Sequence, residues 1–339
     1  MHDAQKPPIK IMLAPIMGVT DYIYRNTFAR FFSGVDLAMA PFISSVQARS
    51  IKPNYLKDLL PDNNPLMPVI PQILSRDPED FLFLAQKIFD LGYTTVNWNL
   101  GCPSPTVVNK RRGSGLLPFP ELISRFLDRV VPALSGELSI KLRLGRYATT
   151  ELEALWPIFN HYSLSEIIIH PRLGVQMYGG IVDIEAFERS LAMTNHRIVY
   201  NGDIRTLADF QRLSLRLPGV DTWMIGRGLL GNPFLAAEIR SFLNPSLKSN
   251  QDMAILQQFH AALYGQYQDV LSGPSHLLAR MKGIWGYFAD NFVNPGKARK
   301  LIYKTNTPDH YLDVVHHLFE NRETDPHSDQ TAPILSSSH

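Results

Sequence analysis

The chain has 339 residues, of which 45% are hydrophobic and 19% charged, a composition typical of a globular protein with ample material for a core. The formal net charge is only +2, so nucleic-acid binding would have to come from a local basic patch. No run approaches the ~18 consecutive apolar residues that a membrane span needs.

The cysteine content and the first residues of the chain indicate the cellular compartment of the protein. A single cysteine excludes an internal disulfide and any multi-cysteine metal site, and we expect no metal. Met1 to Lys10 is polar and carries two prolines, which is typical of neither a signal peptide nor a transit peptide. These features predict a protein of the reducing cytoplasm without a membrane segment.

Short apolar runs rich in β-branched residues recur along the first two thirds of the chain. They lie at Ile9–Ala14, Asp36–Phe42, Pro68–Leu74, Thr95–Leu100, Leu138–Leu144, Glu166–His170, Arg197–Tyr200 and Thr222–Gly226. Stretches with helical spacing separate most of them, for example Pro78–Leu91, Phe119–Val131, Thr149–Tyr162 and Thr206–Leu217. Eight such βα units predict an α/β protein with a closed (β/α)₈ TIM barrel. The alternative is an open doubly wound sheet, which is less favoured because no G-x-G-x-x-G follows the first strand.

The alternation of predicted strands and helices ends after Phe234. Asn244–Asn250 is typical of a linker, and the spacing predicts helices at Met253–Val270, at Ser275–Phe292 and near Tyr311–Phe319. We therefore expect a catalytic barrel over residues 1–240, a small all-α domain over residues 241–320 and a disordered polar tail over residues 321–339.

The only cysteine lies in the segment Asn97-Trp98-Asn99-Leu100-Gly101-Cys102-Pro103, where a predicted strand ends. A lone cysteine is most often a small buried hydrophobe. Here, however, two amide side chains, a glycine and a proline surround a thiol held by a rigid strand. Cys102 could then act as a nucleophile or as a proton donor, depending on its surroundings.

Other polar or glycine-rich residues lie on the remaining predicted strands or at their ends. They carry Pro15, Ile16, Met17, Gln72, Lys141, Arg143, His170, Arg172, Asn201, Gly202, Asp203, Gly226 and Arg227. Each alone could be structural, but the carboxyl ends of barrel strands meet on one face, which is where such barrels carry their chemistry. The loops after the seventh and eighth strands commonly hold a phosphate, and a buried Lys141 could either favour a reduced flavin or form an ion pair inside the barrel.

With these segments in order, the chain resembles the tRNA-dihydrouridine synthase family. The matching motifs are Ala14-Pro15-Ile16-Met17-Gly18-Val19-Thr20-Asp21, Pro71-Gln72, Asn97-x-Asn99-x-Gly101-Cys102-Pro103, Lys110-x-x-Gly113-Ser114-Gly115, Lys141-x-Arg143-x-Gly145, His170-x-Arg172, Asn201-Gly202-Asp203-Ile204 and Met224-Ile225-Gly226-Arg227-Gly228. The region after residue 245 is similar to the C-terminal domain of that family, though less distinctively.

The resemblance implies an enzyme that uses FMN and NADPH to reduce the C5–C6 double bond of a uridine in tRNA. It assigns Pro15, Ile16, Met17, Gln72, Lys141 and His170 to the flavin, and Gly202, Asp203, Gly226 and Arg227 to the phosphate end of FMN. Asn201 is also expected to bind the cofactor. The resemblance assigns Asn99, Arg143, Arg172 and Lys110 to the substrate. It makes Cys102 the proton donor to C5 while hydride reaches C6.

A tRNA substrate also needs a basic surface. Between Ala279 and Lys304 the cations are Arg280, Lys282, Lys297, Arg299, Lys300 and Lys304, and the acid is Asp290. We expect Lys297, Arg299 and Lys300 to contact phosphates. The helical spacing of Met281, Ile284, Trp285 and Phe288 predicts that most aromatic residues there pack inside the domain instead.

Two other functions are compatible with parts of this pattern. An FMN-dependent barrel reductase of a small molecule, such as a free pyrimidine or an enone, would share the phosphate loops but would not explain the basic helical region. A catalytically inactive tRNA-binding or scaffold protein is disfavoured by the presence of Cys102, Lys141 and His170 together.

Overall fold

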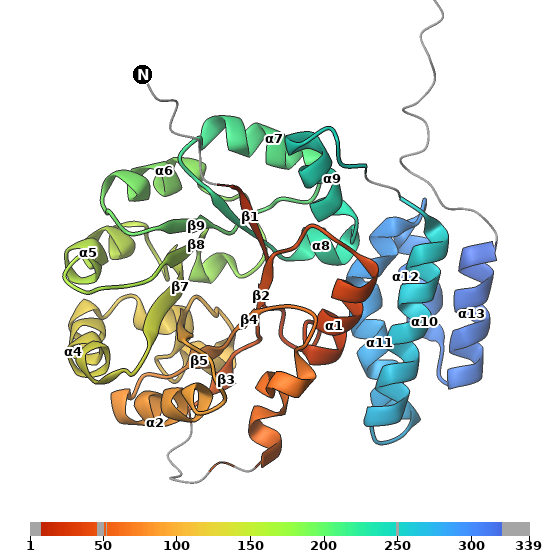
Figure 1. Ribbon diagram of the computed structural model, residues 1–339, viewed down its shortest axis with the longest axis horizontal. Coiled ribbons are helices and arrows are strands. Elements are labelled where there is room, and N and C mark those ends of the chain that lie inside the picture. Colours follow the sequence, from red (N-terminus) through yellow and green to blue (C-terminus); the bar gives the residue numbers. More distant parts are fainter. Residues whose placement is uncertain (1–7, 46–50, 52, 249–250, 321–339) are drawn as a thin grey trace, which may run out of the picture.

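The computed structural model describes residues 8–45, 51, 53–248 and 251–320. Strands and helices alternate from β1 (Lys10–Leu13) to β10 (Thr222–Ile225), and the strands form the ring seen in Figure 1. The other strands are β2 (Leu37–Met39), β3 (Ile43–Ser44), β4 (Val69–Ile70), β5 (Gln72–Leu74), β6 (Thr95–Leu100), β7 (Glu137–Gly145), β8 (Ile167–Leu173) and β9 (Ile198–Tyr200).

Helices surround this ring and continue beyond it. The barrel helices are α1 (Tyr22–Phe31), α2 (Pro78–Phe89), α3 (Pro105–Val108), α4 (Pro120–Val130), α5 (Thr150–Phe159), α6 (Ile184–Ala192), α7 (Leu207–Arg216), α8 (Arg227–Gly231) and α9 (Leu235–Leu243). They are followed by α10 (Met253–Val270), α11 (Pro274–Phe288), α12 (Pro295–Lys304) and α13 (Pro308–Glu320). No helix among the described residues is long and apolar enough to cross a membrane.

The sheet closes into a barrel with eight strand positions. The strand pairs of the described chain are all parallel, and β1 lies between β10 and β2. Two positions are each divided between two short strands, because Pro41 separates β2 from β3 and Pro71 separates β4 from β5, and proline has no N–H for the ladder. The predicted TIM barrel is thus confirmed, and the open sheet is not observed.

Side chains along each strand point alternately toward the helices and into the barrel, so the core has an outer and an inner part. On β6, Val96, Trp98 and Leu100 face the helices, where Trp98 stacks on Phe126 of α4 with ring centroids 3.8 Å apart. The other face of the sheet points into the barrel. There a small apolar cluster forms from Met12, Ala14, Met39, Ile168, Val199 and Met224. Polar residues occupy the interior beside it, and this polar part becomes the wall of the site described below.

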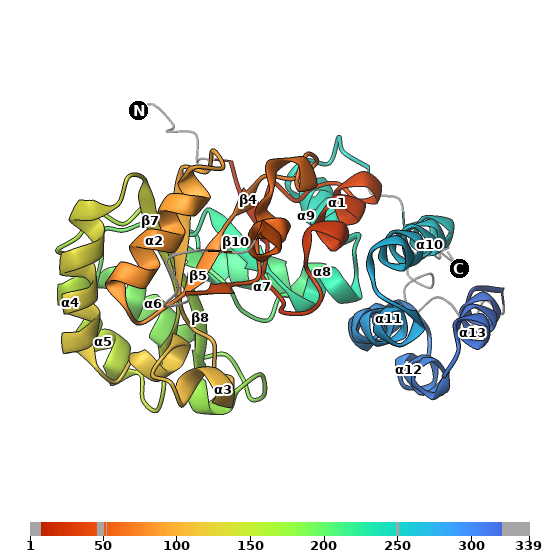
Figure 2. The same ribbon diagram turned by 90° about the horizontal axis from the view of Figure 1, so that it is seen from below.

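The helices α10–α13 form a bundle beside the barrel, next to α1 and α8 (Figures 1 and 2). Phe259 of α10 packs edge-on against Tyr24 and Phe32, with ring centroids 5.8 and 4.9 Å away. A hydrogen bond of 2.9 Å from the Gln266 amide to the Thr27 hydroxyl adds a polar contact across the same junction. These contacts fix the bundle to the first helix of the barrel.

The bundle differs from its sequence prediction in one helix. The expected helix at Ser275–Phe292 ends at Phe288, and α12 then begins at Pro295, where no helix is expected. Asn294 caps α12 by accepting a hydrogen bond from the N–H of Lys297. An Asn-Pro pair at a helix start is a recognised sequence signal, so α12 could have been found.

The predicted domain boundaries can be compared with the helices and strands of the structure. The division after residue 240 falls within α9, and the division itself stays a prediction. In the expected linker, residues 244–248 lie outside helices and strands, whereas residues 249–250 and the expected tail at 321–339 lie outside the described residues.

A buried polar trio lies in the core of the bundle. His260 Nε2 is 2.7 Å from the Tyr311 hydroxyl, and the Trp285 indole N–H donates to that hydroxyl over 2.8 Å. Met281, Ile284 and Phe288 are buried with them, as the helical spacing predicts. Burial lowers the pKa of His260 to about 3, so this imidazole is neutral in the folded chain.

The neutral His260 makes stability depend on pH. The folded pKa of about 3 lies below the value of about 6.5 in an unfolded chain, so the unfolded chain takes up the proton first as the pH falls. We expect His260 to reduce the free energy of unfolding by about 1 kcal/mol between pH 7 and pH 5.5. Urea unfolding at both pH values measures this change. His260→Gln should unfold with a smaller pH difference, and an unchanged difference would contradict the assignment.

Candidate active site

A cavity of about 510 Å³ opens at the carboxyl ends of the barrel strands. It contains every residue that the sequence assigns to the cofactor, together with Cys102, Asn99 and Arg143. The predicted residues on its wall are Pro15, Ile16, Met17, Gln72, Asn99, Cys102, Lys141, Arg143, His170, Asn201, Gly202, Asp203, Gly226 and Arg227. Residues from all parts of the barrel sequence thus converge on one site.

Five residues expected at the substrate do not line this cavity. Lys110 lies outside the cavity, just after α3 in the loop that follows β6 and carries Cys102, here called the cysteine loop. Arg172 is buried and does not line the cavity. Lys297, Arg299 and Lys300 lie on α12. Arg299 is paired internally, 3.1 Å from Asp290.

Two tyrosines on the wall were not expected. Tyr178, 57% exposed, comes from the loop after β8, and Tyr287 comes from α11 of the helical bundle. Tyr287 does not share the helical spacing of the buried residues Met281, Ile284 and Phe288. The sequence could thus have predicted that this tyrosine lies outside the core of the bundle. The bundle therefore contributes directly to the site.

Hydrogen bonds fix the backbone of Cys102 on both sides. The Asn99 side-chain oxygen accepts the N–H groups of Gly101 (3.1 Å) and Cys102 (2.9 Å). The carbonyl of Cys102 accepts the N–H of Ser114 (3.0 Å) and its hydroxyl (3.1 Å). At Gly113, with φ of 55°, a Cβ atom would lie 2.6 Å from that carbonyl oxygen, so glycine is required there. The thiol therefore has a defined position.

A chain of side-chain amides supports this loop from inside the barrel. Asn99 donates to the Gln72 oxygen over 2.7 Å, and Gln72 donates to the Asn97 oxygen over 2.8 Å. Asn97 in turn donates to the Ser139 hydroxyl over 2.8 Å. Asn99 has both lone pairs of its oxygen engaged and keeps one N–H for a ligand. In this structure Asn99 positions the cysteine loop, and its contact with a uracil stays a prediction.

The ionisable groups near the thiol have shifted pKa values. Burial raises the pKa of Cys102 despite nearby Arg143 and Lys141, so the thiol is protonated at neutral pH. Burial, and the cation of Arg143, lower the pKa of Lys141 to about 7. Lys141 is partly buried on the cavity wall and makes no hydrogen bond or ion pair with another described residue. An amine in such a position is poorly solvated, so it favours a ligand that supplies an acceptor or a negative charge.

The ends of β9 and β10 form the opposite part of the cavity. Arg227 begins α8, donates to Asp203 over 2.7 Å and donates to the carbonyl of Tyr178 over 3.1 Å. The N–H groups of a first helical turn have no partner within the helix, so this end suits an anion. At Gly228 a Cβ atom would lie 2.0 Å from the Ile204 carbonyl oxygen, so only glycine permits this approach.

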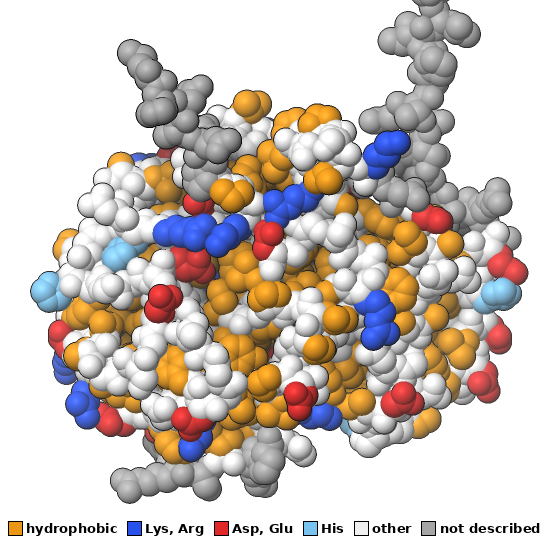
Figure 3. All heavy atoms as spheres, viewed as in Figure 1, with side chains coloured by type: hydrophobic (Ala, Val, Ile, Leu, Met, Phe, Trp, Pro, Cys, Tyr) orange, Lys and Arg blue, Asp and Glu red, His pale blue; other side chains and the backbone are white. Residues whose placement is uncertain are grey.

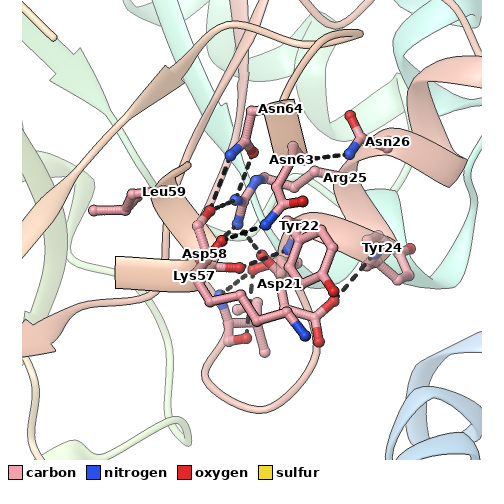
Figure 4. Close-up of polar contacts among 12 residues, drawn as sticks. Asp21, Tyr22, Tyr24, Arg25, Asn26, Lys57, Asp58, Leu59, Asn63 and Asn64 are labelled. Carbon is pink, nitrogen blue, oxygen red and sulfur yellow. Dashed lines mark hydrogen bonds and ion pairs between the residues drawn. The ribbon is translucent and has the colours of Figure 1, made fainter. Parts of the chain in front are cut away.

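The loop after β1, which carries Pro15, Ile16 and Met17, is anchored by a buried arginine. Arg25 of α1 is fully buried and donates to the Thr20 carbonyl over 2.8 Å, and it pairs with Asp58 over 3.0 Å. Figure 4 shows Arg25 enclosed by Asp58, Asn63 and Asn64 from the segment that follows β3. The carboxylate of Asp58 also accepts the N–H of Tyr22. The loop is thereby tied to the rest of the barrel.

The same loop is joined to the helical bundle. Asp21 caps α1 and accepts hydrogen bonds from the Tyr267 hydroxyl (2.7 Å) and from Arg280 (2.9 Å). Arg280 also donates to the carbonyl of Gly18 over 2.8 Å. Arg280, which was expected on the basic surface, therefore joins the bundle to the loop on the cavity wall.

Fold and site together define a TIM-barrel protein with a ligand cavity at the carboxyl ends of its strands and one thiol on the cavity wall. The sequence model of the dihydrouridine synthase family matches residues 12–320. The chain therefore belongs to the dihydrouridine synthase family.

Similar proteins agree with this placement. A probable tRNA-dihydrouridine synthase of Rhodobacter capsulatus is 27% identical over 94% of this chain and 96% of the relative. The tRNA-dihydrouridine synthase B of Xanthomonas axonopodis pv. citri is 27% identical over 92% and 93%. Among solved structures, a morphinone reductase variant in complex with tetrahydroNAD shares the fold, with a TM-score of 0.51 and 11% identity over 73% of this chain and 89% of that one.

Metal-binding side chains are not grouped in the part of the chain that the structure describes. No three His, Cys, Asp or Glu side chains lie close enough there to hold an ion. Cys102, the one thiol, is surrounded by amides and cations instead.

The raised pKa of Cys102 is directly measurable because the chain has no second thiol. We expect alkylation of the native chain by iodoacetamide to reach half its maximal rate at a higher pH than alkylation of the urea-unfolded chain, since burial disfavours the thiolate. Mass spectrometry of the labelled protein gives the rate, and Cys102→Ser sets the background. A native midpoint below the unfolded one would show an activated thiolate instead.

Proposed function

We propose that this protein reduces the C5–C6 double bond of a uridine in tRNA to dihydrouridine, with FMN as cofactor and NAD(P)H as reductant. The observation that carries the proposal is the presence, on one cavity wall, of a protonated thiol at Cys102 and of the Lys141 amine, which has no hydrogen-bond or ion-pair partner among the described residues. Membership of the dihydrouridine synthase family supports the same reaction.

The residues present fit FMN. Lys141 offers a cation to the pyrimidine edge of a flavin, and Pro15, Ile16, Met17 and Gln72 line the same cavity. Gly226 and Arg227 at the start of α8, with Gly202 and Asp203 after β9, offer N–H groups and one arginine to the phosphate. Asn201, whose amide donates to the carbonyl of Met224 over 2.8 Å, holds these two strand ends together.

Cys102 would supply the proton of the reaction. FMN, when bound, supplies the hydride for C6 of the uracil. Negative charge then develops toward C5, and an acid on that side must neutralise it. Because burial raises the pKa of Cys102, its thiol carries the proton at neutral pH. The Cys102 N–H donates to the Asn99 side-chain oxygen and the Cys102 carbonyl accepts from the Ser114 hydroxyl, and these two hydrogen bonds keep the thiol at one place.

The base has to leave the RNA stack to reach this cavity. The remaining tRNA then needs cations outside it, and several of the expected ones are already engaged. Lys282 donates to the carbonyls of Tyr303 and Thr305, and Arg299 pairs with Asp290. Lys300 and Lys304 are exposed on α12 and make no hydrogen bond or ion pair with another described residue. We therefore propose Lys300 and Lys304 as the principal phosphate contacts of this helix.

The visible face in Figure 3 supports the choice of a local contact surface. On that face Lys and Arg side chains are scattered among acidic and apolar ones, and they do not gather into a broad patch. This face therefore offers RNA only separate cations, which is compatible with attraction by a local group of cations elsewhere on the surface.

Cys102→Ala tests the reaction. The variant should bind FMN and oxidise NADPH as the original chain does, yet reduce tRNA uridine about 10²–10⁴-fold more slowly, because it lacks the general acid. Dihydrouridine in tRNA is measured by mass spectrometry, and bound FMN by its absorbance. Equal tRNA reduction by both proteins would remove Cys102 from the reaction. An original chain that binds FMN but reduces only a small molecule, never tRNA, would refute the tRNA substrate.

Charge reversal on α12 tests the RNA surface. Lys300→Glu with Lys304→Glu should weaken tRNA binding and flatten the log–log salt dependence by roughly 0.7–0.9 for each lost phosphate contact. FMN content should not change, since neither lysine lines the cavity.

The matched control reverses two exposed cations elsewhere. Lys10 lies at the amino end of β1 and Arg125 lies on α4, so Lys10→Glu with Arg125→Glu makes the same change in net charge away from the proposed surface. Binding measured by filter retention over a salt series should differ between the two pairs. Equal loss in both would indicate a general charge effect and contradict a specific contact by α12.

A further inference from the structure

Arg172 is 2% exposed, and its guanidinium is surrounded by acceptors. Its Nε donates to the Gly179 carbonyl over 2.9 Å. One terminal nitrogen donates to His170 Nε2 over 3.0 Å and to Asp203 over 3.2 Å. The other donates to the Gly180 carbonyl over 2.7 Å and also pairs with Asp203. The charge and the donors of this side chain are therefore directed into the protein.

A count of donors decides what Arg172 can do. A guanidinium has five N–H groups, and the five contacts above use all of them. None is left for a substrate, in agreement with the absence of Arg172 from the cavity wall within the described chain. The expectation that Arg172 binds the substrate directly has no support in this geometry, and another role is needed.

The contact with Arg172 determines which ring nitrogen of His170 carries a proton. Arginine can only donate, so His170 Nε2 must accept, and a ring nitrogen that accepts carries no proton. The ring must then be neutral with its proton on Nδ1. His170 lines the cavity, and Nδ1 makes no hydrogen bond with another described residue.

We propose that Arg172 is a positioning residue that fixes His170 as the neutral Nδ1–H tautomer, so that the imidazole presents a hydrogen-bond donor to the ligand in the cavity. The matching ligand group is an acceptor, such as a carbonyl oxygen or an unprotonated ring nitrogen. The identity of that ligand as a flavin rests on the proposed function, whereas the tautomer itself is a property of the chain.

The charges around His170 agree with a neutral ring. Lys141 and Arg143 face it from β7, Arg227 faces it from α8, and Arg172 adjoins it on β8. Burial and these cations hold the pKa of His170 well below its usual range. The nearby acid, Asp203, is already shared between Arg172 and Arg227, and the Cys102 thiol is protonated. An imidazolium here would add a further cation without a carboxylate of its own.

The same guanidinium also holds a loop. Its bonds to the carbonyls of Gly179 and Gly180 fix the segment after β8, in which Tyr178 lies over the Arg143 guanidinium at 5.6 Å from the ring centroid. A lysine in place of Arg172 could not make these contacts together with the one to His170, because it lacks the planar fork. Arg172 thus joins the loop, the imidazole and Asp203.

The tautomer can be read by NMR on the chain without FMN. We expect histidine labelled with ¹⁵N to show, for His170, a protonated Nδ1 and an unprotonated Nε2 at pH 7, unchanged down to pH 5.5. His170→Gln identifies the signal among the eleven histidines. In Arg172→Met the single tautomer should be lost, with Nε2–H or an imidazolium appearing. Arg216→Met is the matched control, since it removes an arginine paired with Glu188 on the outside of the barrel.

The original chain decides the question even if Arg172→Met does not fold. A His170 signal with Nε2 protonated, or a charged ring at pH 7, overturns the proposal. So does an Arg172→Met variant that folds and keeps the Nδ1–H tautomer alone. FMN plays no part in this measurement, so a correct tautomer in a chain that fails to bind FMN would refute only the proposed function.

Discussion

The site depends on the alternation of side chains along three neighbouring parallel strands. On β6, β7 and β8 every second residue points into the barrel, which brings Asn99, Lys141 and His170 to the same cavity wall. The intervening residues, such as Trp98 and Leu142, are packed against helices and prevent the strands from rotating or slipping. A shift of register by one residue would exchange the two sets. Packing on the outer face therefore holds the chemistry on the inner face.

The cavity wall is electrostatically unbalanced. The basic groups among the residues that line it are Lys141, Arg143, Arg205 and Arg227, and the acid among them is Asp203. Asp203 is already committed to two arginines. Burial, and with it the repulsion from neighbouring cations, lowers the pKa of Arg143 to about 10 and that of Lys141 to about 7. An anionic or acceptor-rich ligand relieves that repulsion, so the same imbalance that costs stability in the free chain favours binding.

Local patterns predicted most of the barrel, and long-range packing accounts for the rest. The eight strand positions follow from short apolar runs rich in β-branched residues. Cys102 could be placed because it lies in the loop that follows β6, and Lys141 and His170 could be placed because they lie within β7 and β8. The contacts of Arg172 could not be predicted, because it donates to the carbonyl oxygens of Gly179 and Gly180 in a loop. The direction of these carbonyl groups is set only when the chain folds. Counting cations likewise overstated the free basic surface, since Arg280 and Arg299 have acidic partners.

The helical bundle takes part in the cavity as well as in the outer surface of the molecule. Tyr267 and Arg280 bind Asp21 on the loop that carries Pro15 and Met17, and Tyr287 lies on the cavity wall itself. The bundle is also packed on α1 through Phe259, so it cannot turn relative to the barrel without breaking a buried aromatic cluster. A tRNA bound to α12 would then be held at a fixed orientation to the cavity. Which uridine reaches Cys102 would follow from this rigid junction as well as from the cavity wall.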